Sequence, residues 1–182
     1  ASDGVIFASP NYSFQMSGIM KTFLDRLAFA FHRPRFFGKA FTSIVTQGIG
    51  LGNKTVDSLD FAGKCLGFNT VKGSFITALE PMTDREKQKM DRALAGQARR
   101  YYARLVKPGL PVPGLFMLMG FRMGRTNVSL ELDNNSRDYT YYAEKGWFES
   151  DYFYPTRLGL VKKGAGKLFD RMQARTTRAR YA

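Results

Sequence analysis

The stretch Val5–Leu27, "VIFASPNYSFQMSGIMKTFLDRL", decides the fold. It opens with a continuous apolar run, Val5–Ala8, which is typical of a strand buried on both faces inside a parallel sheet. A polar segment follows, and then apolar residues recur at helical spacing over 19–31, with Ser17 in the N-cap position. The stretch therefore predicts a strand, a loop and an amphipathic helix that ends near residues 32–34.

The same order of strand and helix repeats twice more along the chain. The predicted strands are Ala40–Thr46 and Thr70–Thr77, and the predicted helices run from about Val56 to Leu66 and from a capping box of Thr83 and Glu86 to Lys107. Strands that alternate with helices imply right-handed crossovers. We therefore expect an α/β fold with a parallel, doubly wound sheet.

A proline-rich linker, "KPGLPVPG" (107–114), marks a change of composition. We expect a first domain at 1–107 and an extension at 108–182 that packs on the first part or on a partner chain. The extension holds eight aromatic residues between Tyr139 and Tyr154, mixed with Glu144, Glu149 and Asp151. These acids would repel phosphates, so the aromatic residues are expected to be buried rather than stacked on bases.

The formal net charge of +13 is concentrated near the end of the chain. Residues 157–182 hold eight lysines and arginines against one acid, Asp170. Such a charge suits nucleic acid, an anionic membrane surface or anionic small molecules, and it equally describes a solvated helix face. Of these partners, nucleic acid is the disfavoured one.

Other features of the sequence exclude several classes of protein. Cys65 is the only cysteine, which excludes an intrachain disulfide framework and a cysteine-built metal site, and fits a reducing compartment. The longest apolar run, 114–121, is too short to span a bilayer, and no secretory signal is recognisable. We expect a soluble, cytoplasmic protein.

Two loops follow the carboxyl ends of the first two predicted strands, where open parallel sheets bind ligands. The loop at 9–16 offers main-chain N–H groups and the polar side chains of Asn11, Tyr12 and Gln15. The loop at 47–52 holds three glycines, which allow the backbone to approach a flat ligand. An ordinary strand-to-helix turn and an ordinary glycine turn are the alternatives.

The segment "DGVIFASPNYSFQMSGIMKTFLDRL" resembles the flavodoxin-like NAD(P)H-dependent FMN reductases. The shared pattern is Asp-Gly, an apolar strand, Ser-Pro-x-Tyr, Ser-Gly, Lys and Phe-(Leu/Ile)-Asp-Arg. "GKAFTSIVTQGIG" and "LGFNTVKG" resemble the next two strands of that family, and "YYAEKGWFESDYFYP" resembles an extension of some flavodoxin-family members. The resemblance implies a flavodoxin-like three-layer fold with a C-terminal extension.

The resemblance also implies FMN as cofactor, NAD(P)H as hydride donor and a second, small-molecule acceptor such as a quinone or a flavin. The residues that it assigns to the flavin are Ser9, Pro10, Asn11 and Tyr12 along the ring, Ser13, Phe14, Gln15 and Ser17 closing the pocket, and Thr46, Gln47, Gly48 and Gly50 from the second loop. It assigns no catalytic acid or base and no metal. It implies a homodimer or homotetramer.

One part of the family pattern is missing from the sequence. The strand, phosphate-binding loop, helix and second strand that open the family's fold are not found, and we expect them to precede Ala1 in a longer chain. Two other functions stay open. The chain could be a flavin-free module whose basic extension docks nucleic acid or an anionic surface, or an electron carrier that does not oxidise NAD(P)H directly.

Overall fold

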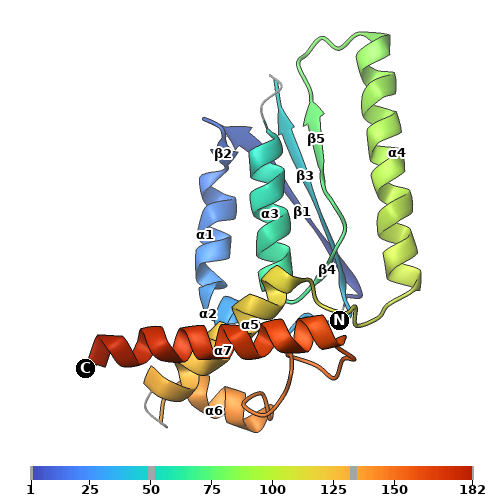
Figure 1. Ribbon diagram of the computed structural model, residues 1–182. Helices are drawn as coiled ribbons and strands as arrows, with labels where there is room; N and C mark the ends of the chain where they lie inside the picture. Colours follow the sequence, from blue (N-terminus) through green and yellow to red (C-terminus); the bar gives the residue numbers. More distant parts are fainter. Residues whose placement is uncertain (1, 49–51, 132–134, 182) are drawn as a thin grey trace. The chain divides into compact units, whose positions relative to one another are not determined.

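The computed structural model describes residues 2–48, 52–131 and 135–181 (Figure 1). The chain divides into two compact units, residues 1–109 and residues 110–182. Each unit is described by itself.

The first unit is built on a sheet of mostly parallel strands. Its strands are β1 (Gly4–Tyr12), β2 (Gln15–Met16), β3 (Ala40–Gln47), β4 (Asn69–Thr70) and β5 (Ser74–Thr77). The order is β2-β1-β3, and both β4 and β5 pair with β3. All pairings are parallel except that of β1 with β2, which form a hairpin.

Four helices flank this sheet. They are α1 (Gly18–Arg26), α2 (Ala28–His32), α3 (Asn53–Cys65) and α4 (Asp84–Val106). Figure 1 shows α1 and α3 on one face of the sheet and α4 on the other. This arrangement confirms the predicted flavodoxin-like α/β fold with helices on both faces.

The alternation of side chains along the strands explains the two layers. Phe7 and Phe41 point to the side of α1 and α3, where their rings meet edge to face at 4.9 Å in the main hydrophobic core. On the opposite side, the buried Gln97 of α4 donates hydrogen bonds to Thr42 Oγ1 at 2.7 Å and to the main-chain oxygen of Ser43 at 2.9 Å. β3 is therefore packed on both faces, but the prediction that Val5–Ala8 is buried on both faces is wrong, because Ile6 is 50% exposed and Ala8 is exposed.

The local signals for helix ends are confirmed. Ser17 is the N-cap of α1, and its hydroxyl accepts from the main-chain N–H of Met20 at 3.3 Å. Thr83 and Glu86 form the capping box of α4. Each side chain satisfies a main-chain N–H group that the helix leaves without a partner.

Two predicted elements are interrupted. The helix after Ser17 is broken at Leu27, which separates α1 from α2. The strand predicted at Thr70–Thr77 is divided into β4 and β5, because the N–H of Gly73 donates to the Asp60 carboxylate at 2.9 Å instead of to a neighbouring strand. Asp60 also accepts from the Ser43 hydroxyl at 2.7 Å. Periodicity alone does not predict such side-chain competition for the backbone.

The second unit is helical and has its own core. Its helices are α5 (Leu115–Glu131), α6 (Arg137–Glu144) and α7 (Leu160–Tyr181), and α7 packs across α5 (Figure 1). Trp147 lies at its centre, 4.9 Å from the ring of Tyr142 and 4.8 Å from that of Phe153. The aromatic residues of the extension are thus buried against one another and against Phe121 of α5.

A partly buried ion network joins α5 to α7 inside this unit. Arg122 donates to Asp170 at 2.5 and 3.1 Å and to Asp151 at 3.0 Å, and Arg125 donates to Asp170 at 2.8 Å. Burial and the neighbouring Arg122 lower the pKa of Arg125, while Asp170 and Asp151 raise it. The two arginines therefore depend on these carboxylates for compensation of their charge.

Over the described residues, no helix combines the length and the apolar character that a passage through a lipid bilayer needs.

Candidate functional site

The two loops singled out by the sequence lie at one edge of the sheet. β1 and β3 run parallel in a register that places Pro10 opposite Thr46. Because parallel strands end at the same edge, the segments after Pro10 and after Thr46 lie together. We call this edge the carboxyl rim, defined by residues 9–17 and 46–48.

The predicted loop at 9–16 is instead a continuation of β1 followed by a tight hairpin. β1 extends to Tyr12, which pairs with Gln15, and Asn11 pairs with Met16. Ser13 and Phe14 form the turn, with φ values of 48° and 64°. Positive φ at both central residues is the requirement of the hairpin turns that match strand twist. The sequence signal for such a turn is Asn-Gly or Asp-Gly, and its absence explains why the hairpin was not predicted.

Asn11 fastens this hairpin to the rest of the rim. Its side chain is buried, and its amide nitrogen donates to Gln47 Oε1 at the end of β3. Its amide oxygen accepts from the hydroxyl of Thr55, in the first turn of α3, at 2.7 Å. Thr55 Oγ1 also lies 3.4 Å from the main-chain oxygen of Phe14. The side chains of Asn11 and Gln47 are therefore directed at each other rather than outwards.

Ser9 and Ser17 form a second link across the base of the hairpin. Ser9 is buried, and its hydroxyl accepts from the main-chain N–H of Ser17 at 3.0 Å. The same hydroxyl donates to the main-chain oxygen of Pro10 at 2.9 Å. The start of α1 is thereby held against the end of β1.

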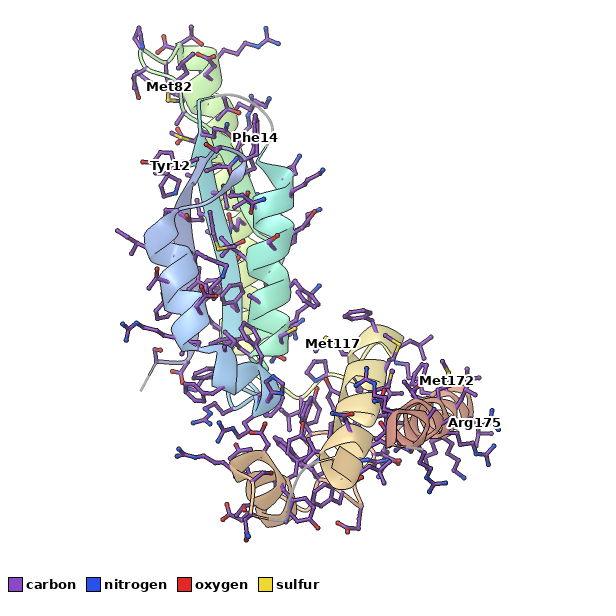
Figure 2. All side chains as sticks on the ribbon, turned by 90° about the vertical axis from the view of Figure 1, so that its left-hand side faces the viewer. Tyr12, Phe14, Met82, Met117, Met172 and Arg175 are labelled. Atoms are coloured by element: carbon purple, nitrogen blue, oxygen red, sulfur yellow. The ribbon has the colours of Figure 1, made fainter. Side chains whose placement is uncertain are left out.

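The remaining members of the predicted set are more accessible. Tyr12 is 66% exposed and Phe14 is 51% exposed. Figure 2 shows both at the rim end of the first unit. The other residues divide into two classes: Ser13, Gln15 and Thr46 are exposed, whereas Pro10, Gln47 and Gly48 are half-buried. The hairpin thus presents two aromatic side chains from a base held by buried hydrogen bonds.

The glycine segment contributes less than its composition indicated. Gly50 lies outside the described residues. Gly52 is the N-cap of α3, and a Cβ there would lie 2.1 Å from the ring of Phe75. A glycine is therefore required at position 52 by the packing of Phe75, independently of any ligand. A Cβ at Gly48 would lie 3.3 Å from Leu79, a side chain that is 64% exposed.

Sequence reasoning missed two residues that contact the rim, Thr55 and Leu79. No motif in the sequence distinguishes Thr55, and only the structure shows that it is buried and bonded to Asn11. Leu79 follows the last predicted strand, and only the structure shows that its side chain is exposed beside Gly48.

Other reactive groups do not gather into a site. No group of three or more His, Cys, Asp and Glu side chains with metal-binding geometry occurs in the part of the chain that the structure describes. Burial raises the pKa of the Cys65 thiol, which disfavours the reactive thiolate.

Residues 1–80 match the protein family described as NADPH-dependent FMN reductase. The matched part contains all five strands and helices α1 to α3, and therefore the whole described rim. Its members use FMN with NAD(P)H as the electron donor. No curated protein matches this chain.

Proposed function

We propose that the chain holds FMN at the carboxyl rim and passes electrons from NAD(P)H to a small-molecule acceptor, because its residues 1–80 match the NADPH-dependent FMN reductase family. The acceptor class that we propose is a quinone, a flavin or another small planar oxidant. The exposed rim would admit a donor and an acceptor in turn.

The observation that carries the proposal is the pair of exposed aromatic side chains on a fastened hairpin. Tyr12 and Phe14 are 66% and 51% exposed, yet they flank a turn that is tied to β3 and α3 through Asn11. Large apolar side chains on a protein surface are typical of a binding site when they occur together. Aromatic rings suit the flat apolar face of an isoalloxazine, and a hairpin whose base is already held loses little backbone entropy on binding. The residues present therefore fit the ring of FMN.

We propose different roles for the accessible and the buried residues of the rim. Tyr12 and Phe14 would contact the ring and exclude water from it, and Ser13, Gln15 and Thr46 would offer hydrogen bonds at its edge. Ser9, Asn11, Ser17 and Gln47 would position the hairpin, since their side chains bond to one another or to nearby backbone. The backbone of Pro10 and Gly48 would line the pocket. When bound, FMN supplies the group that takes hydride and releases electrons.

The assembly and the location belong to the same proposal. We propose a homodimer or homotetramer, because a rim that presents two exposed aromatic rings would be shielded further by a second subunit. We propose a cytoplasmic location, because a single half-buried cysteine fits a reducing compartment.

The test is a titration of the purified protein with FMN, followed by anaerobic addition of NADPH or NADH. We expect quenching of flavin fluorescence on binding and bleaching of the visible flavin absorbance on reduction. A quinone added afterwards should restore the absorbance. Circular dichroism on the same sample shows whether the protein is folded.

A folded protein that takes up no FMN would contradict the proposal. Rapid binding with slow bleaching by both nicotinamides, but fast reduction by a reduced partner protein, would favour an electron carrier instead.

A further inference from the structure

Helix α7 has a well-defined inner face. The buried Thr177 lies on it, Gln173 Nε2 donates to Asn127 Oδ1 of α5 at 3.0 Å, and Asp170 binds Arg122 and Arg125 of α5. These contacts fix the rotation of the helix about its own axis. The opposite side chains must therefore point away from α5.

The outer face of α7 carries an apolar stripe. Val161, Leu168 and Met172 are 82%, 55% and 50% exposed. Their spacing of seven and four residues puts them on one side of the helix. Figure 2 shows Met172 on the side of α7 turned away from α5. An amphipathic helix normally has one apolar face, whereas α7 has this stripe in addition to its contacts with α5.

A basic stripe runs beside the apolar one. Its exposed residues are Lys167, Arg171, Arg175 and Arg178, separated by four, four and three positions. Arg175 also projects away from α5 in Figure 2. The only acid within Leu160–Tyr181 is Asp170, which is occupied by the inner ion network. The described outer face of α7 therefore joins apolar and cationic groups without a compensating carboxylate of its own helix.

We propose that this outer face docks on the surface of an anionic phospholipid bilayer, with α7 parallel to the membrane plane. Val161, Leu168 and Met172 would enter the boundary between head groups and acyl chains. Lys167, Arg171, Arg175 and Arg178 would contact the anionic head groups. A helix with a cationic stripe beside an apolar one has the two properties that interfacial binding requires.

The chemistry of the face disfavours the other occupants. A second copy seated on the apolar stripe would bring two basic stripes together, and α7 offers no outward acid to pair with them. Nucleic acid would satisfy the cations but would leave the aliphatic side chains in water, since DNA and RNA present few aliphatic groups. The inference does not depend on flavin binding, and its test needs no flavin.

The experiment is vesicle sedimentation with the full chain. Vesicles of phosphatidylcholine alone are compared with vesicles of equal parts phosphatidylcholine and phosphatidylglycerol, at low and at high salt. We expect binding only to the anionic vesicles, and weaker binding at high salt because ions screen exposed charges.

Two variants separate the two stripes. The substitutions Lys167→Gln, Arg171→Gln and Arg175→Gln should lower the affinity about 100-fold, since each cation near an anionic membrane contributes a few-fold to tenfold. The substitutions Val161→Ser, Leu168→Ser and Met172→Ser should lower it about tenfold or more through lost apolar burial. A matched control on α4, Lys87→Gln, Arg99→Gln and Arg104→Gln, removes the same charge from another exposed helix and should change the affinity less than threefold.

Circular dichroism and thermal melts of each variant verify that α7 stays folded, since all six substituted side chains are exposed. The proposal is overturned if folded wild-type protein fails to sediment with anionic vesicles at low salt. It is also overturned if the serine variant binds as tightly as wild type, which would indicate attraction to any polyanion, or if the control loses as much affinity as the α7 charge variant. Self-association that is lost in the serine variant, without vesicle binding, would identify a second copy as the occupant.

Discussion

The side-chain oxygen of Asn11 accepts a hydrogen bond of 2.7 Å from the hydroxyl of Thr55, a residue 44 positions further along the chain. The partners lie on different elements, the end of β1 and the first turn of α3. The amide nitrogen of the same Asn11 bonds to Gln47 at the end of β3. One buried side chain therefore fixes the relative positions of three elements that form the carboxyl rim.

Replacement of Asn11 by alanine should destabilise the first unit. The change leaves the buried Thr55 hydroxyl and the Gln47 amide without their partner, and we expect a loss of about 2 kcal/mol in the free energy of unfolding. Urea denaturation measures this loss. Asn53→Ala, at an exposed position on α3, is the control and should change stability by less than about 0.5 kcal/mol. Equal effects of the two substitutions would contradict the role of the Asn11 bonds.

Removal of the aromatic ring of Tyr12 should weaken FMN binding. We expect Tyr12→Ala to raise the Kd for FMN about tenfold, and Phe14→Ala to act in the same direction, because each would remove a contact to the flavin ring. Fluorescence titration gives the Kd. Tyr102→Ala is a matched control, since Tyr102 is 65% exposed on α4. An unchanged Kd in Tyr12→Ala would separate this residue from the flavin site.

Relief of the positive-φ backbone at Ser13 and Phe14 should stabilise the protein, while loss of the Phe14 ring should weaken FMN binding. Both residues have positive φ, and Asn-Gly is the pair that such a turn favours. We expect the double substitution Ser13→Asn and Phe14→Gly to raise the free energy of unfolding by about 1 kcal/mol, and to weaken FMN binding.

Gly38→Ala is the reverse change, since it places a side chain at a residue with positive φ. Gly38 has a φ of 81° and open space around its Cα, so Gly38→Ala introduces only the left-handed penalty. Its stability should fall by about 1 kcal/mol. If the turn variant gains no stability while Gly38→Ala loses some, the hairpin turn is not strained.

The carboxylate of Asp170 should matter far more than that of Asp25. Asp170 compensates Arg122 and Arg125, whose side chains are 8% and 12% exposed, whereas Asp25 pairs with Lys21 where both side chains are 61% exposed. Asp170→Asn should cost about 3 kcal/mol of stability, because it removes the carboxylate partner of Arg125 and leaves Arg122 with Asp151 alone. Asp25→Asn should cost less than about 1 kcal/mol. Thermal melts compare them, and a small effect of Asp170→Asn would show that water compensates the arginines.

Tyr142 should make the second unit sensitive to alkali. Burial raises its pKa to about 12 from the ordinary value of 10.0, with a further contribution from Asp138. The unfolded chain therefore releases this proton first. The contribution of the neutral phenol, roughly 3 kcal/mol, is complete below pH 10 and is lost as the pH rises through 12. Tyr142→Phe should reduce the decline of stability over this pH range, and denaturation at several pH values measures it. The same decline in both proteins would assign it to other groups.

Local patterns in the sequence predicted much of the first unit. The apolar runs of β1 and β3, the N-cap Ser17 and the capping box at Thr83 act through neighbours in the chain, so a linear pattern contains them. The family match of residues 1–80 also rests on the linear order of residues in the sequence. The interruption of the third strand was not predicted, because it depends on Asp60, which approaches Gly73 only after α3 has packed.

The sequence by itself determined which segments become strands and helices and which family residues 1–80 match, because periodicity, caps and motifs are local. Only the tertiary structure decided that Asn11 fastens the hairpin at residues 9–16 to β3 and α3, and that α7 turns apolar and basic stripes outward. These outcomes depend on contacts between residues far apart in the sequence. Such contacts stabilise the protein only after the chain has brought the distant residues together, at the entropic cost of closing the intervening loops.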